Sequence, residues 1–100
     1  MNLREYLLNI VMEESCEIAL AASKCKRFTE DHKHYADSNF ERLQTEITDL
    51  VTALKMLSEY LGRDISLSPS ADKEMRIKAY MAISCRMGML DDTSLEIQQP

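Results

Sequence analysis

Four acidic side chains of this chain form two pairs, and within each pair the carboxylates are three residues apart. The pairs are Glu14 with Glu17 and Glu46 with Asp49. On a helix, residues three apart share one side, so the two carboxylates of each pair can contact the same bound group. Two carboxylates about 5 Å apart repel by roughly 3 kcal/mol at an effective dielectric of about 20. Convergence of the four therefore indicates a divalent cation, with Mg²⁺ expected and Mn²⁺ as the alternative.

Both pairs fall in or beside the apolar face expected for their helix. In the first helix, apolar residues recur at alternating spacings of three and four, and Glu14 and Glu17 continue that series. The apolar members are Leu3, Leu7, Ile10, Ala21 and Phe28. In the second helix, Glu46 and Asp49 lie beside the series Leu43, Ile47, Leu50, Leu54, Leu57 and Leu61. We therefore expect these carboxylates at a buried surface, whereas a solvated run of charge would lie on the opposite face.

Local signals predict three helices, over residues 2–28, 40–61 and 71–87. Asn2 is a good N-cap for the first helix, and Ser38 with Glu41 forms a capping box for the second. Gly62 suits the residue that ends the second helix, and Ser70 can cap the third.

The segment 29–38 has no helical period and is expected to be a polar connection. His32 and His34 lie in it, two residues apart, and solvent exposure is expected there more than metal binding. A di-iron bundle would need Glu-x-x-His on a helix, and the sequence contains none. This absence favours Mg²⁺ or Mn²⁺ for the carboxylates.

Composition favours a small all-α protein. The chain has 100 residues, two glycines, two prolines and seven methionines, and we expect one domain over 1–89 followed by a tail over 90–100. The net charge of −5 argues against binding to nucleic acid. Charged residues interrupt the N-terminal apolar stretch, so neither a signal peptide nor a membrane span is expected. Three cysteines without C-x-x-C spacing indicate reduced thiols and a cytoplasmic location.

The acidic pattern resembles a known family. Glu-Glu-x-x-Glu at Glu13, Glu14 and Glu17 is followed after 28 residues by Glu-x-x-Asp at Glu46 and Asp49. This order is similar to the signature of the MazG-like all-α nucleoside triphosphate pyrophosphohydrolases, and the resemblance covers roughly residues 5 to 88. The segments 24–28 and 39–43 are also in the style of the family.

The resemblance implies a fold and an activity. The fold would be an antiparallel helical bundle of two long helices and a shorter third, completed in a homodimer or homotetramer, which would also thicken a core that is thin for one chain. The activity would be Mg²⁺-dependent hydrolysis of a nucleoside or deoxynucleoside triphosphate to the monophosphate and pyrophosphate. Glu14, Glu17, Glu46 and Asp49 would bind the metal, and Glu13 would either orient a water molecule beside them or be an ordinary solvated residue.

Three basic residues are candidates for phosphate contacts. Lys24 continues the apolar face of the first helix towards the acids, and Arg27 follows it by three residues. Lys78 lies in the third helix, where an ordinary surface role is as probable as a phosphate contact. Ala53 stands where the family often carries an asparagine or an aromatic residue. The alternative to an enzyme is a non-catalytic helical module that assembles or binds a partner.

Overall fold

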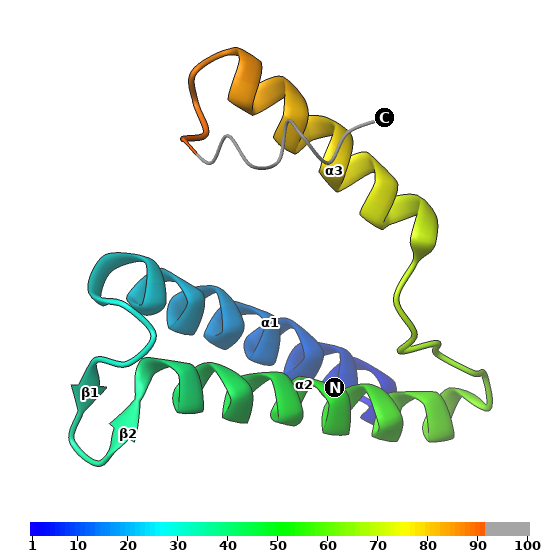
Figure 1. The fold of residues 1–100 in the computed structure, drawn as a ribbon. Coiled ribbons are helices and arrows are strands. Elements are labelled where there is room, and N and C mark those ends of the chain that lie inside the picture. The colour runs from blue at the N-terminus through cyan, green and yellow to red at the C-terminus, as the bar shows by residue number, and fades with distance from the viewer. Residues whose placement is uncertain (92–100) are drawn as a thin grey trace. The chain divides into compact units, whose positions relative to one another are not determined.

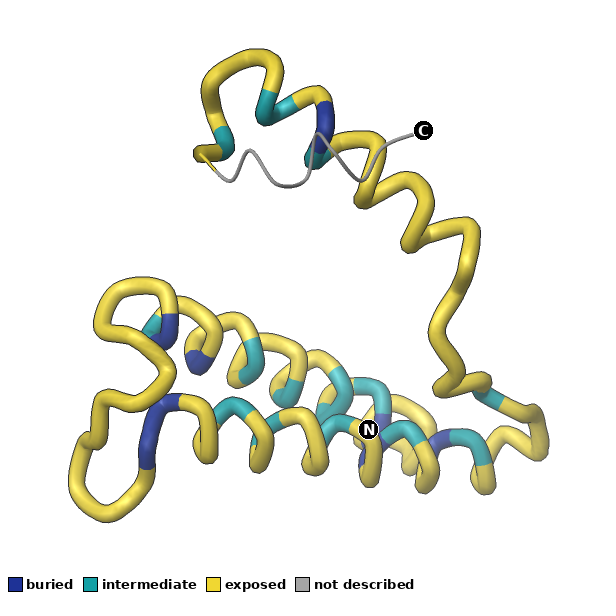
Figure 2. Tube along the Cα trace, viewed as in Figure 1, coloured by how far each residue is buried: buried dark blue, intermediate teal, exposed yellow. Residues whose placement is uncertain are grey.

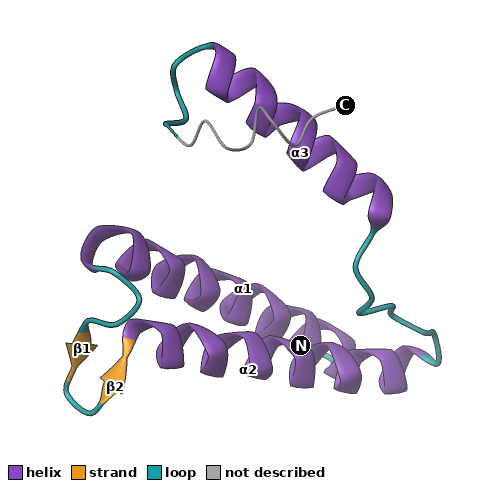
Figure 3. Cartoon of the chain, in the orientation of Figure 1, coloured by secondary structure: helices purple, strands orange, loops and turns teal. Residues whose placement is uncertain are grey.

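The computed structural model describes residues 1–91, which are mostly helical (Figure 1). The helices are α1 (Leu3–Phe28), α2 (Asn39–Leu61) and α3 (Ala71–Arg86). Two short strands, β1 (Lys33–His34) and β2 (Asp37–Ser38), lie between α1 and α2 in the chain (Figure 3). The prediction of an all-α protein is confirmed in its helical content, and each helix begins and ends within one residue of the expected bounds.

Side-chain caps fix the helix ends at the predicted residues. The Asn2 side chain accepts a hydrogen bond from the first turn of α1, and Ser70 does the same for α3. At the start of α2, Ser38 Oγ accepts from the Glu41 backbone N–H at 3.0 Å, and the Ser38 N–H donates to Glu41 Oε1 at 3.4 Å. Gly62 ends α2 with φ 63°, in the left-handed region that glycine adopts without a steric penalty.

The chain divides into two compact units, Met1–Leu67 and a second that begins at Ser68 and contains α3. The predicted tail, 90–100, lies outside the described residues from position 92 onward. Within residues 1–91, no helix combines the length and the apolar character that crossing a membrane requires.

In the first unit, α1 and α2 lie side by side and run in opposite directions (Figure 1). Their contact surface buries Leu7, Ala21 and Cys25 of α1 against Ala53 and Leu57 of α2. In Figure 2, buried and intermediate positions recur along the sides of α1 and α2 that face each other. Because both alanines are small, the helix axes can approach closely at the points where they pack.

The buried face of α1 differs from the predicted apolar series. Leu3 and Phe28 are 54% and 51% exposed, and Glu17 is exposed as well. The predicted series averages 3.5 residues per turn, whereas a straight helix has about 3.6, so the series drifts by about 20° per heptad. Leu7 and Cys25 are separated by about five full turns and stay on the buried line. The prediction that Glu17 lies in the buried face was therefore wrong.

The connection between α1 and α2 contains a β-hairpin that the sequence analysis did not predict. Its register pairs Lys33 with Ser38 and His34 with Asp37, around a turn in which Tyr35 has φ 63°. Two-residue hairpin turns normally place glycine or asparagine at a positive φ, and neither occurs in this turn.

Candidate metal centre

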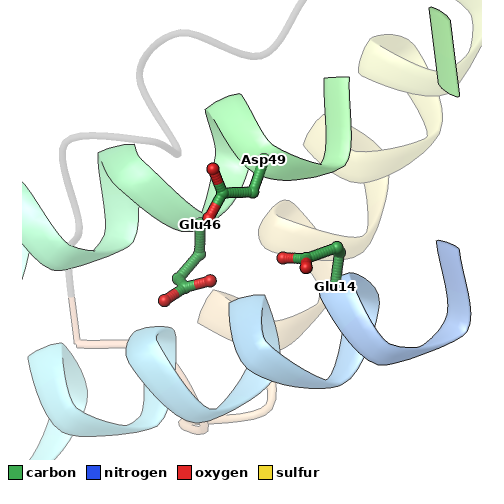
Figure 4. A group of neighbouring side chains, drawn as sticks. All are labelled: Glu14, Glu46 and Asp49. Carbon is green, nitrogen blue, oxygen red and sulfur yellow. The ribbon is translucent and has the colours of Figure 1, made fainter. Parts of the chain in front are cut away.

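Three carboxylates converge between α1 and α2: Glu14 from α1, and Glu46 and Asp49 from α2 (Figure 4). We call them the acidic trio. One carboxylate oxygen from each residue lies within 4.8 Å of the other two. The helices produce this arrangement because Glu46 and Asp49 are three residues apart on one side of α2, and the antiparallel packing brings Glu14 opposite them.

The trio lies at a partly buried part of the helix contact. Glu14 is half-buried, the Glu46 side chain is 14% exposed, and Asp49 is exposed at the edge. Partial burial raises the pKa of Glu14 above its ordinary value, and the negative charges of Asp49, Glu46, Glu17 and Glu13 raise it further, in that order. The raised pKa of Glu14 therefore reflects both its partial burial and the like charges gathered around it.

The donor set and spacing of the trio suit a hard divalent cation. Two oxygens bound to one Mg²⁺ ion can be at most about 4.2 Å apart, which is twice the usual bond length. The oxygens of the trio, which lie within 4.8 Å of one another, would therefore have to move closer together to share one ion. An oxygen-only set of three carboxylates matches Mg²⁺ or Mn²⁺ better than zinc or copper.

The other two acids of the motif lie outside this group. Glu17 is exposed, and it lines a small cavity of about 30 Å³ together with Lys24, Arg42 and Glu46. We call this space the bridging cavity. Glu13 is exposed on the outer side of α1. Glu17 is thus beside the trio but not part of it.

The predicted phosphate contacts lie in three different settings. Lys24 is half-buried and lines the bridging cavity. Arg27 is exposed, with its guanidinium 5.4 Å from the centre of the Phe28 ring. Lys78 lies in the second unit, where its Nζ is 3.6 Å from Glu74 Oε1. Lys24 is therefore the member of the set that the structure places beside an acid of the trio.

Arg42 is a site residue that the sequence analysis did not single out. Its Nε lies 4.0 Å from Glu46 Oε1, and its side chain lines the bridging cavity. The signal was present in the sequence, because a basic residue four positions before an acid on one helix faces that acid.

The two histidines make ring contacts in the connection between α1 and α2, and Ala53 lies in the helix contact. The His32 ring stacks on Phe28 with the ring centres 5.5 Å apart, and His34 makes an edge contact with Tyr35. Ala53, at the position where a larger residue was considered, is 4% exposed and packs between the two helices.

Comparisons with protein-family models, with curated proteins and with solved structures give no match for this chain.

Proposed function

We propose that this protein is a metal-dependent nucleoside triphosphate pyrophosphohydrolase that acts on nucleotides of the cellular pool. The substrate would be a nucleoside or deoxynucleoside triphosphate, and the products would be the monophosphate and pyrophosphate. The observation that carries the proposal is the meeting of three carboxylate oxygens from two helices within 4.8 Å. Anions so close together destabilise the fold unless a cation joins them.

The acids divide into metal ligands and supporting residues in this proposal. Glu14, Glu46 and Asp49 would hold Mg²⁺, or Mn²⁺ in its place. The bound ion would supply charge neutralisation for the phosphates and would lower the pKa of a water molecule. Glu17, exposed beside the trio, would complete the ligand set or orient the attacking water, and Glu13 would support it from the next position on the helix.

The reaction breaks the phosphoanhydride bond between the α and β phosphates. The oxygen of a water molecule forms a new bond to phosphorus, the bridging oxygen leaves with pyrophosphate, and the protons of the water pass to a carboxylate and to solvent. Lys24 would contact the triphosphate beside the trio, and Arg27 of the same unit would be a further phosphate contact, whereas a phosphate contact of Lys78, in the second unit, stays a prediction from the sequence. No covalent bond between protein and substrate is needed.

The test is pyrophosphate release from a panel of ribonucleoside and deoxynucleoside triphosphates in the presence of Mg²⁺. We expect the monophosphate and pyrophosphate in equal amounts from at least one substrate, and loss of at least 100-fold in kcat in Glu46→Gln, a threshold of about 2.7 kcal/mol. Glu59→Gln is the matched control, because Glu59 is an exposed acid of the same helix, and within residues 1–91 its one ion pair is with Lys55 at 4.0 Å. Release of orthophosphate, or no release from any substrate, would overturn the proposal.

A homodimer or homotetramer would complete the helical bundle. The support is the number of large apolar side chains that α1 and α2 expose, which would be costly to leave in water. They are Leu3, Tyr6, Met12, Leu20, Phe28, Phe40, Ile47, Val51, Met56, Tyr60 and Leu61. Light scattering decides the point, since a stable monomer of 11.5 kDa at micromolar concentration would contradict it. A cytoplasmic location agrees with the three free cysteines and with a nucleotide substrate.

The same exposed apolar residues favour a second candidate function, a non-catalytic helical module that assembles or binds a partner. In that case, the trio would bind a cation for stability alone or would bind none. The nucleotide panel separates the two functions, because the module would assemble normally and release no pyrophosphate.

A further inference from the structure

A second cavity adjoins the bridging cavity at the end of the helix pair where the β-hairpin lies. It has a volume of about 270 Å³, and we call it the hairpin pocket. Its polar lining consists of Lys24, His34, Tyr35, Asp37, Asn39 and Arg42, with Ser38 at the start of α2. Lys24 and Arg42 line both cavities, so these two cations stand between the hairpin pocket and Glu46.

Hydrogen bonds hold the walls of the hairpin pocket in place. The buried Asn39 side chain donates to the carbonyl oxygens of Thr29 at 2.9 Å and Lys24 at 3.4 Å, which ties α2 to the end of α1. The backbone N–H of Asn39 donates to His32 O, and that of Phe40 donates to Glu30 O, both at 2.9 Å. Because the first N–H groups of α2 are already paired, the start of α2 offers an anion in the pocket side chains rather than free backbone N–H groups.

The charged side chains are ordered along one side of the helix pair. Glu17 and Lys24 are seven residues apart on α1, and Arg42 and Asp49 are seven apart on α2, so each pair lies on nearly one line. Because α1 runs towards the hairpin and α2 runs away from it, both cations lie at the hairpin end and the acids lie further along. Lys24 is half-buried, and no ion pair holds it among the described residues.

We propose that the hairpin pocket is the subsite for the terminal phosphates of the substrate, bound by Lys24 and Arg42. The inference rests on the proposed function and adds the direction of the substrate. The leaving pyrophosphate would point towards the hairpin, and the nucleoside would point away from it, past the acidic trio. The lining also contains one carboxylate, that of Asp37, which repels an anion that comes close to it. The phosphates would therefore lie near Lys24 and Arg42, on the side of the pocket that faces the helices.

Calorimetric titration of inorganic pyrophosphate in the presence of Mg²⁺ tests this subsite without any turnover. We expect Lys24→Met, which keeps the apolar stem but removes the charge, to raise the Kd for pyrophosphate by about tenfold, as loss of a charge-assisted contact does. Arg42→Gln should have a similar effect. Lys26→Met is the matched control, because Lys26 is an exposed lysine of the same helix outside the cavity lining, and it should leave the Kd unchanged.

Further variants and ligands show whether a change in Kd comes from the lost charge of Lys24. Lys24→Arg should retain the affinity, which separates loss of charge from loss of packing, and the helical circular dichroism of each variant shows that it is folded. The Kd of Lys24→Met for a nucleoside monophosphate should differ little from that of wild type. The phosphate of the monophosphate would lie on the nucleoside side of the scissile bond, away from Lys24. Three results would each overturn the inference. Lys24→Met could weaken binding of the monophosphate as much as binding of pyrophosphate, sulfate could bind wild type as tightly as pyrophosphate does, or Lys24→Met could leave the Kd for pyrophosphate unchanged.

The subsite and the enzymatic function can fail separately. Pyrophosphate binding that depends on Lys24, in a chain that hydrolyses no triphosphate, would keep the subsite and remove the enzyme. Hydrolysis of a triphosphate with a pyrophosphate Kd unchanged in both variants would keep the enzyme and overturn the subsite.

Discussion

The contact between α1 and α2 contains two stretches of opposite character. Towards the start of α1, Leu7 packs with Ala53 and Leu57 of the contact surface, and all three are at most 5% exposed. Further along the same surface, Glu14 and Glu46 occupy positions in the helical repeat that an apolar residue would fill, with Asp49 at their edge.

The two stretches affect the stability of the fold in opposite ways. The apolar stretch lowers the free energy of the folded state by removing side chains from water. The acidic stretch does the opposite in the absence of a cation, since like charges meet there at reduced exposure to water.

The largest expected effect concerns the apolar stretch. Leu57→Ala should lower the free energy of unfolding by about 2–4 kcal/mol, because it removes buried methyl groups and leaves a cavity. Urea unfolding measures the loss, which should be the same in Mg²⁺ and in EDTA. Met56→Ala, at a neighbouring residue that is 51% exposed, is the control and should change stability much less. A loss in Leu57→Ala that appears only in the presence of Mg²⁺ would contradict the division into two stretches.

A smaller effect is expected from Asp49→Asn, which keeps the shape of the side chain but removes one anionic ligand. The Kd for Mg²⁺, measured by calorimetry, should rise by about 10- to 100-fold, and pyrophosphate release should fall with it. The apo protein should keep its stability, since Asp49 is exposed and its charge is repelled by the other two carboxylates of the trio. Unchanged Mg²⁺ affinity would remove Asp49 from the site.

The smallest effect is a dependence of stability on pH. The pKa of Glu14 is raised in the folded protein, so the folded state binds this proton more tightly than the unfolded state does. In EDTA, wild type should therefore become more stable relative to Glu14→Gln as the pH falls from neutral towards the ordinary carboxyl value of 4.5. This gain should be lost again as the pH rises through the raised pKa. Denaturant unfolding of the two proteins at several pH values checks the sign, and a difference that moves the other way would refute it.

Much of the fold could be predicted because its signals are local. Asn2, the Ser38–Glu41 capping box, Gly62 and Ser70 each act within one turn of a helix, so the sequence alone fixes where helices begin and end. The meeting of Glu14 with Glu46 and Asp49 was predicted in part, because the three-residue spacing places acids on one side of a helix.

The rest depends on contacts between segments that are distant in sequence. The prediction that Glu17 lies in the buried face was wrong, because a spacing of three or four residues does not fix the exact rotation of a helix against its partner. The β-hairpin lacks the usual turn residues, and Tyr35 takes the positive φ that they would normally take. The place of Arg42 between two cavities follows only from the hairpin and the packing of α1 against α2.

The most direct test of the central claim, that the acidic trio is a cation site, is the thermal melting of wild type and Glu14→Gln in EDTA and in Mg²⁺. In EDTA, Glu14→Gln should melt at the same temperature as wild type or higher, because the substitution removes repulsion within the trio. Mg²⁺ should raise the Tm of wild type in a concentration-dependent way, since a ligand that binds only the folded state stabilises it, and should leave that of Glu14→Gln nearly unchanged. A wild-type Tm that does not respond to Mg²⁺, together with a lower Tm for Glu14→Gln in EDTA, would show that these carboxylates are structural and would contradict the account.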